Sequence, residues 1–252
     1  MKKVLGRKQN IDNLSWLEAM VHIEEYVTRP ELDELVGQTI EEIKATVGDK
    51  HAAYAWSAGK DSIVLGDICE KAGIHESMIA VTNLEYPAFD SWVRENAPEG
   101  CEIINTGQDL EWLKKHMGML FPDTSQKAAQ WFHIVQHRAQ AKYYKAHSLD
   151  MILLGRRKAD GNFVGRGTNI YTNANEGVTR YSPLSEWPHE AILAYIHYHG
   201  LDMPPIYGWH NGYLCGTHPW PARQWTHGNG WEEIAAIDSE LAENAKRTLG
   251  IE

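Results

Sequence analysis

Short apolar segments alternate with helical segments from residue 51 onward, and this alternation constrains the fold more than any other feature. Strands that alternate with helices indicate an α/β fold with a parallel sheet. The segment at 150–155 is almost uniformly apolar, as a central parallel strand should be. The strands that we expect are residues 51–56, 77–83, 101–105, 150–155 and 178–181.

Helix-like spacing of apolar residues fills the intervals between these strands and continues beyond them. We therefore expect a parallel five-stranded sheet with helices on both faces, preceded by N-terminal helices and followed by an irregular C-terminal segment. The boundaries that we expect are an N-terminal helical segment 1–48, a sheet-containing domain 49–204 and a Trp-, His- and Gly-rich segment 205–252. The expected helices cover residues 11–47, 62–72, 87–96, 108–118, 126–147, 188–199 and 232–249.

The composition excludes several classes of protein. A formal net charge of −10 argues against a nucleic-acid-wrapping surface, because phosphate contacts need clustered Lys and Arg. No run approaches the ~20 apolar residues of a membrane helix, and the start lacks the apolar segment of a signal peptide. Three cysteines without a CxxC pair argue against a Cys-only zinc site or an iron–sulfur cluster. We expect a cytoplasmic protein with no membrane contact.

The loop Ser57-Ala58-Gly59-Lys60-Asp61-Ser62 connects the first expected strand to a helix. A small-residue loop at a helix N-terminus presents backbone N–H groups and the positive end of the helix dipole, so it can hold phosphate. Gly59 permits close backbone approach, and Lys60 supplies a point charge. Asp61 is either a ligand of Mg²⁺ bound to the phosphates or a first-turn carboxylate that complements the dipole.

This loop resembles the PP-loop (SGGxDS) of the N-type ATP pyrophosphatases, with Ala58 in place of the first glycine. The resemblance implies that ATP lies with its leaving pyrophosphate in the loop, and that the sheet is of the adenine nucleotide alpha hydrolase type. It makes residues 49–204 a nucleotide-binding domain. Asn83, in a degraded form of the family's DTGxxFPET stretch, is expected to contact the adenine or the ribose.

A basic turn follows the fourth expected strand. This basic turn is Gly155-Arg156-Arg157-Lys158-Ala159-Asp160-Gly161, at the end of the most apolar strand, and ligands of parallel sheets bind at the carboxyl ends of strands. We expect Arg156 or Arg157 to hold the α-phosphate or an acceptor anion, and Gly155 to lie in the binding site. A solvated basic turn is the alternative.

The block from Arg180 to Tyr207 resembles the RxxPLxxWxxxDVWxYIxxxxLPxxPLY stretch of the PAPS reductase branch, which includes the sulfate adenylyltransferase small subunit. True reductases of that branch carry a nucleophilic cysteine in an ECGLH-type motif. The nearest feature is Leu214-Cys215-Gly216-Thr217-His218, which lacks the Glu and precedes more than thirty further residues. Cys215 is either a buried, inert residue or an activated thiolate.

Three functions stay open at this stage. The first is an ATP- and Mg²⁺-dependent adenylyltransferase that cleaves between the α- and β-phosphates. Lys60, Arg156 and Arg157 are its expected catalytic residues, and its acceptor is a small anion or a nucleobase. The second is a PAPS or APS reductase that uses Cys215, and the third is a non-catalytic adenine-nucleotide-binding or scaffolding protein. Self-association and an accessory subunit remain open.

Overall fold

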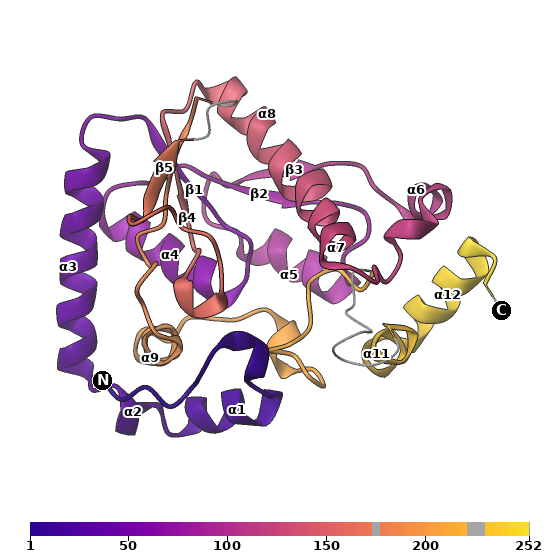
Figure 1. Ribbon diagram of the computed structural model, residues 1–252, viewed down its shortest axis with the longest axis horizontal. Helices are drawn as coiled ribbons and strands as arrows, with labels where there is room; N and C mark the ends of the chain where they lie inside the picture. The colour runs from indigo at the N-terminus through magenta and orange to yellow at the C-terminus, as the bar shows by residue number, and fades with distance from the viewer. Residues whose placement is uncertain (173–176, 221–229, 252) are drawn as a thin grey trace. The chain divides into compact units, whose positions relative to one another are not determined.

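The computed structural model describes residues 1–172, 177–220 and 230–251. It contains a six-stranded sheet in the order β3-β2-β1-β4-β6-β5 (Figure 1). Strand β1 pairs in parallel with β2 and β4, β4 pairs in parallel with β6, and β5 is antiparallel to β6. The strands are β1 (Ala52–Ala55), β2 (Ser77–Val81), β3 (Glu102–Asn105), β4 (Met151–Leu154), β5 (Ile170–Thr172) and β6 (Thr179–Tyr181).

The predicted α/β fold with a mainly parallel sheet is confirmed, but the sheet has one more strand than the five we expected. The additional strand β5 has only three residues, none of which is buried. A short, half-exposed edge strand carries no apolar alternation. Its pairing with β6, for example Tyr171 opposite Arg180, is set by the tertiary structure.

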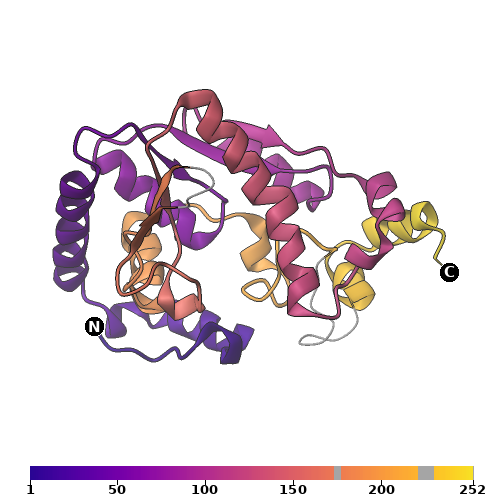
Figure 2. The same ribbon diagram turned by 45° about the horizontal axis from the view of Figure 1, so that its top comes forward.

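The expected helices are present with local differences, and the expected span 11–47 is divided into helices 13–21, 23–26 and 29–47. Helix α4 begins at Lys60, two residues earlier than expected. A π-helical turn, His133–His137, joins α7 to α8 within one continuous rod (Figure 2). Asp238 separates the last two helices, because its side chain accepts a hydrogen bond from Leu241 N and starts a new helix. The helices are α1 (Asn13–Val21), α2 (Ile23–Tyr26), α3 (Arg29–Val47), α4 (Lys60–Lys71), α5 (Pro87–Asn96), α6 (Leu110–Lys115), α7 (Ser125–Phe132), α8 (Arg138–His147), α9 (His189–His199), α11 (Gly230–Ile237) and α12 (Ser239–Leu249), with short 3₁₀ turns η1 (Lys8–Asn10), η2 (Met117–Met119), η4 (Lys158–Asp160) and η5 (Pro205–Gly208).

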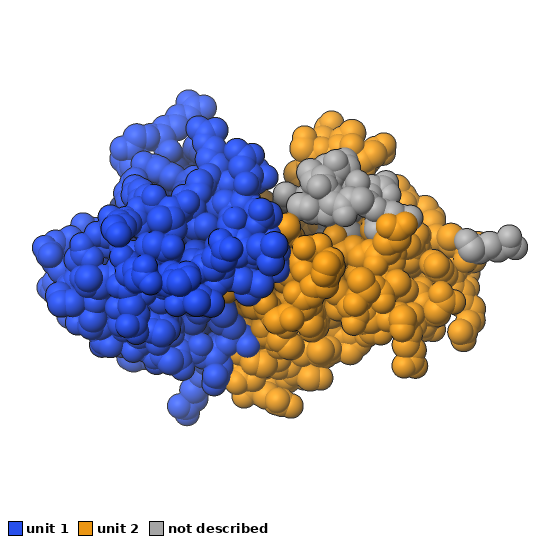
Figure 3. Space-filling view, turned by 90° about the horizontal axis from the view of Figure 1, so that it is seen from below, with its two compact units in different colours: residues 1–79, 97–102, 142–203 blue, residues 80–96, 103–141, 204–252 orange. Residues whose placement is uncertain are grey.

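The chain forms two compact units, which Figure 3 shows in different colours. Unit 1 comprises Met1–Ile79, Ala97–Glu102 and Lys142–Met203, and unit 2 comprises Ala80–Asn96, Ile103–Ala141 and the chain from Pro204 onward. The N-terminal helices therefore belong to unit 1, and the Trp- and His-rich C-terminal segment belongs to unit 2.

The core of unit 1 lies around β4 and α9. All four residues of β4 are buried, and the first eight residues of α9 are buried as well. A helix that is apolar almost all round must be covered on every side. Helix α9 contacts α1, α2, α3 and α4, so the N-terminal helices are part of the packing around the sheet.

In unit 2 the described tryptophans of the C-terminal segment serve mainly to pack it, and Trp225 lies outside the described residues. Trp231 of α11 contacts Phe121 with ring centroids 5.2 Å apart, and Trp220 lies 6.2 Å from Trp231. The backbone N–H of Phe121 donates to the Trp220 carbonyl at 2.8 Å. Within the described ranges, no helix is both long enough and apolar enough to span a bilayer.

Candidate functional site

The loop between β1 and α4 is closed by the side chain of Ser62. Ser62 Oγ accepts the backbone N–H of Ser57 at 2.9 Å and donates to the Gly59 carbonyl at 2.9 Å. The Ser57 hydroxyl also lies 3.1 Å from Ser62 Oγ, and Ser57 itself is exposed. A serine at this position therefore holds the loop in a tight turn directly before the first helical residue, with the helix N-terminus behind it.

Ala58 has the unusual backbone conformation of this loop. Its φ is +57°, in the left-handed region that costs an L-residue about 1–2 kcal/mol. Gly59 has an ordinary extended conformation, with φ −80° and ψ 153°. The position where the PP-loop pattern has its first glycine is thus the one where this fold needs a positive φ, and the chain keeps alanine there.

Gly155 allows the end of β4 to approach the start of α4. A Cβ at Gly155 would lie 3.2 Å from the backbone C and O of Asp61 and 3.3 Å from the backbone N of Ser62. The two segments that the sequence singled out, the loop and the basic turn, are therefore in direct backbone contact. Gly155 is the residue that makes this contact sterically feasible.

Lys60 points into unit 1, where its side chain is 4% exposed. Its Nζ donates to Asp61 Oδ2 at 2.7 Å and lies 5.1 Å from the ring centre of Trp16 in α1. Burial lowers the pKa of the Lys60 ammonium to about 8, although Asp61 acts in the opposite direction. Lys60 is therefore a buried cation that pairs with Asp61 beneath the loop, and its ammonium is not exposed to solvent.

Asp61 pairs with two cations at once. Its Oδ1 accepts from Arg157 Nε at 2.7 Å, and its Oδ2 accepts from Lys60 Nζ. Burial by itself would raise the pKa of Asp61, but the charges of Lys60 and Arg157 outweigh burial and hold this pKa well below its ordinary value. The carboxylate is permanently charged at neutral pH.

Arg157 is completely buried and forms the centre of this network. Besides Asp61, its guanidinium donates to the Trp187 carbonyl and to His189 Nδ1 at 3.0 Å each, and Nη2 lies 2.9 Å from Asp160 Oδ2. A guanidinium with its donors engaged in this way has little capacity left for a ligand. The geometry gives Arg157 the role of positioning Asp61, and its expected contact with a phosphate stays a prediction.

His189 is held neutral by the same network. Burial, followed by the charges of Arg157 and Lys60, lowers its pKa to about 4. Because Arg157 donates to Nδ1, the imidazole carries its hydrogen on Nε2. Sequence reasoning missed His189, Asp160 and Trp16 as parts of this network, and the only signal was the position of Asp160 within the basic turn.

Arg156 differs from Arg157 in being only half-buried. Its Nη1 donates to the Tyr171 hydroxyl at 2.9 Å, so the unpredicted strand β5 orients it. The remaining guanidinium donors leave Arg156 able to form a bidentate contact with an anion. Its expected contact with an anion stays a prediction.

The Asp61 carboxylate is already engaged by cations. Each of its oxygens accepts from Lys60 or Arg157 at 2.7 Å, so a metal ion bound here would share the carboxylate with both side chains. In the part of the chain that the structure describes, no group of three His, Cys, Asp or Glu side chains could hold a metal ion. The contact between Asp61 and Mg²⁺ stays a prediction.

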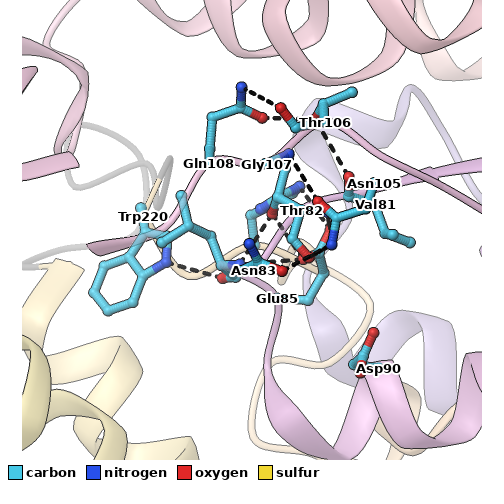
Figure 4. Close-up of polar contacts among 12 residues, drawn as sticks. Val81, Thr82, Asn83, Glu85, Asp90, Asn105, Thr106, Gly107, Gln108 and Trp220 are labelled. Atoms are coloured by element: carbon cyan, nitrogen blue, oxygen red, sulfur yellow. Dashed lines mark hydrogen bonds and ion pairs between the residues drawn. The ribbon is translucent and has the colours of Figure 1, made fainter. Parts of the chain in front are cut away.

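Asn83 lies in unit 2, where the residues that follow β2 and β3 form one polar network (Figure 4). Asn105 Nδ2 donates to Asn83 Oδ1 at 2.7 Å, and the Gly107 N–H donates to Asn105 Oδ1 at 2.7 Å. The Asn83 N–H donates to the Gln108 carbonyl at 2.8 Å. These contacts fix the exposed Asn83 amide and leave its Nδ2 as a donor toward solvent. Its expected contact with a nucleotide stays a prediction.

The C-terminal segment is anchored to the same β2 loop. Trp220 Nε1 donates to the Leu84 carbonyl at 2.9 Å, and Tyr86 N donates to the Thr217 carbonyl at 3.2 Å. Glu85 accepts from the backbone and hydroxyl of Thr82, at 2.8 and 2.7 Å. His218 Nε2 lies 3.5 Å from Glu85 Oε1. His218 is thus a partner of Glu85.

Among the residues that the structure describes, Cys215 lacks the surroundings of an activated thiol. Burial raises the pKa of its thiol to about 12, and Glu233 acts in the same direction. Its Sγ lies 3.6 Å from the His210 carbonyl. A reactive thiolate needs cations or a helix N-terminus nearby. The arrangement favours the inert interpretation of Cys215.

Residues 51–215 match the sequence model of the phosphoadenosine phosphosulfate reductase domain. A solved PAPS reductase from Candida auris, in a phosphate complex, is similar with a TM-score of 0.53 and 19% identity over 73% of this chain and 94% of that one. An FMN adenylyltransferase from Candida glabrata, in complex with FAD and pyrophosphate, has a TM-score of 0.49 and 11% identity over 81% and 70%. An NH₃-dependent NAD synthetase from Campylobacter jejuni has a TM-score of 0.44 and 12% identity over 87% and 93%. No match was found among curated proteins.

Proposed function

The chain belongs to the phosphoadenosine phosphosulfate reductase family, and from this premise we propose that it binds ATP at the loop Ser57–Ser62 and transfers the adenylyl group to a small acceptor. Pyrophosphate is the leaving group. The observation that carries the proposal is the loop itself, closed by Ser62 and set against Gly155 at the N-terminus of α4. Backbone N–H groups at such a position favour a phosphate chain.

In the proposed reaction an oxygen or nitrogen of the acceptor attacks the α-phosphorus of ATP. The bond from that phosphorus to the bridging oxygen of the β-phosphate breaks, and its electron pair leaves with pyrophosphate. Such transfers depend mainly on positioning and on stabilising charge. The loop N–H groups would hold the leaving phosphates, and Arg156 would contact the transferring group or the acceptor anion.

In this proposal Lys60 and Arg157 act through their electrostatic field and by holding Asp61 in position. The cluster of Lys60, Asp61, Arg157 and Asp160 is neutral in sum, so Arg156 gives the loop region a positive excess. Any Mg²⁺ would be held by the phosphate oxygens of the nucleotide, as is usual for this ion. No residue role assigned here depends on it.

The family name also supports a second candidate, sulfonucleotide reduction with Cys215 as the nucleophile. In that reaction the Cys215 thiolate would attack the sulfur of the sulfonucleotide, and the bond from that sulfur to the phosphate oxygen would break, so that the nucleotide leaves. An external dithiol reductant would then release sulfite from the S-sulfocysteine. The raised pKa of the Cys215 thiol weighs against this candidate. We therefore place adenylyl transfer first.

The test is a ligand panel with Mg²⁺ and ATP, AMP, APS or PAPS on the wild type and on Ser62→Ala. Ser62→Ala removes the hydroxyl that closes the loop and leaves the buried charges in place. Saturation at 100 times Kd should stabilise the fold by about 2.7 kcal/mol, which raises the Tm by roughly 5–10 °C in a chain of this size. Release of pyrophosphate is then measured across candidate acceptors.

The proposal is supported if ATP raises the Tm of the wild type more than that of Ser62→Ala, and if the wild type releases pyrophosphate with one of the acceptors. A response to APS or PAPS alone, with turnover lost in Cys215→Ser, would establish the reductase instead. ATP binding without pyrophosphate release for any acceptor would leave a nucleotide-binding protein, and the strained Ala58 would then be a sign of lost catalysis.

A further inference from the structure

Of the cations in the loop and in the basic turn, Lys60 and Arg157 are turned inward, and the exposed Lys158 is paired with Glu186. The side chain of Lys60 is 4% exposed and that of Arg157 is 0% exposed. Each is paired with Asp61 at 2.7 Å. A phosphate chain at the loop therefore needs cations from elsewhere in addition to Arg156.

Lys8 lies at the outer end of the same network. Its Nζ is 3.7 Å from Asp160 Oδ1, and Asp160 in turn pairs with Arg157. The charges alternate in the order Lys8, Asp160, Arg157, Asp61 and Lys60. The Lys8 side chain is 43% exposed, so it combines contact with the network and access to solvent.

Lys8 is electrically coupled to the loop itself. After burial and the nearer partners, its charge contributes to the lowered pKa of both Lys60 and Asp61. The turn η1 that carries Lys8 also contacts η4, the turn that carries Asp160. The position of Lys8 beside Asp160 thus rests on backbone packing as well as on a single ion pair.

The N-terminal segment is fixed in a way that keeps Lys8 in place. Glu190 Oε1 accepts the backbone N–H groups of Val4 and Leu5, both at 2.6 Å, and the Lys2 N–H donates to the Tyr26 carbonyl at 2.7 Å. Glu190 is 1% exposed, so the carboxylate is committed to this task. A surface lysine held by a fixed segment loses less entropy on binding than a free one.

We propose that Lys8 is a binding residue for the phosphate chain of the nucleotide, acting together with Arg156. This inference rests on the proposed function and adds to it a residue from the N-terminal segment. With Lys8 included, the alternating chain has three cations and two carboxylates, a net charge of +1, and Arg156 raises it to +2. An anion at the loop meets this excess.

The experiment measures the affinity of inorganic pyrophosphate and of ATP by calorimetric titration. Lys8→Met keeps the length of the side chain and removes the charge, and it should weaken both ligands by about five- to tenfold. Lys8→Arg should restore binding to within about twofold, because the charge returns. Lys2→Met, which removes an exposed cation from the same segment, should bind like the wild type.

A double variant separates direct contact from a role through Asp160. In Lys8→Met with Asp160→Asn, thermal stability should fall, because buried Arg157 loses its ion pair at 2.9 Å, and the affinity should stay as low as in Lys8→Met. Recovery of the affinity in that variant, or unchanged affinity in Lys8→Met, overturns the assignment while the proposed function stands. Absence of ATP and pyrophosphate binding by the wild type overturns both.

Discussion

Replacing Arg157 by methionine tests the central claim about the site, namely that this arginine is structural. Methionine preserves most of the aliphatic stem and removes the guanidinium. The variant loses the ion pairs to Asp61 at 2.7 Å and to Asp160 at 2.9 Å. The Trp187 carbonyl and His189 Nδ1 lose their donors as well.

The expected magnitude follows from burial. Asp160 is 3% exposed, and after the substitution its nearest cation is Lys8 at 3.7 Å. Removing one member of a buried ion pair typically costs about 3–5 kcal/mol, because the other charge stays buried. At roughly 2–4 °C per kcal/mol for a chain of this size, the Tm should fall by about 6–20 °C.

The assay is urea unfolding at pH 7.5, followed by tryptophan fluorescence, with the Tm measured in parallel. Arg157→Lys should give an intermediate loss, because one ammonium cannot reach all four partners. Arg156→Met is the matched control at the half-buried neighbour and should cost less than about 1 kcal/mol. An Arg157→Met variant within about 1 kcal/mol of the wild type, at an unchanged m-value, would refute the reasoning.

Three further predictions follow from the same geometry. Since the pKa of His189 is about 4 in the fold and 6.5 in the unfolded chain, only the unfolded chain takes up a proton between these values. The free energy of unfolding should therefore fall with decreasing pH through this window, by up to about 3 kcal/mol, and less so in His189→Gln. Gly155→Ala should lower stability by about 1–3 kcal/mol and weaken ATP binding, because its Cβ would press on Asp61, whereas Gly37→Ala, with open space, should stabilise slightly. Cys215 should react with iodoacetamide at pH 8 far more slowly in the native protein than in urea, since its thiol pKa is about 12, and equal rates would contradict this burial.

The sequence alone determined the fold class and the location of the loop. Apolar runs alternating with helical segments are local patterns, so they predict the five main strands and place Ser57–Ser62 after the first. The loop residues are also a local signal, because a turn between a strand and a helix selects small side chains at fixed positions. Gly155 could be singled out for the same reason.

The direction of the charged side chains was decided only by the tertiary structure. From the sequence we expected Lys60 and Arg157 to be exposed and to bind an anion. Both are buried, because Trp16 of α1 and the start of α9 cover them. Strand β5, which orients Arg156, has no apolar pattern of its own. Lys8 lies about fifty residues before the loop, and no local rule connects the two. Burial and ion pairing depend on which elements are packed together, and that is a property of long-range contacts that local periodicity does not encode.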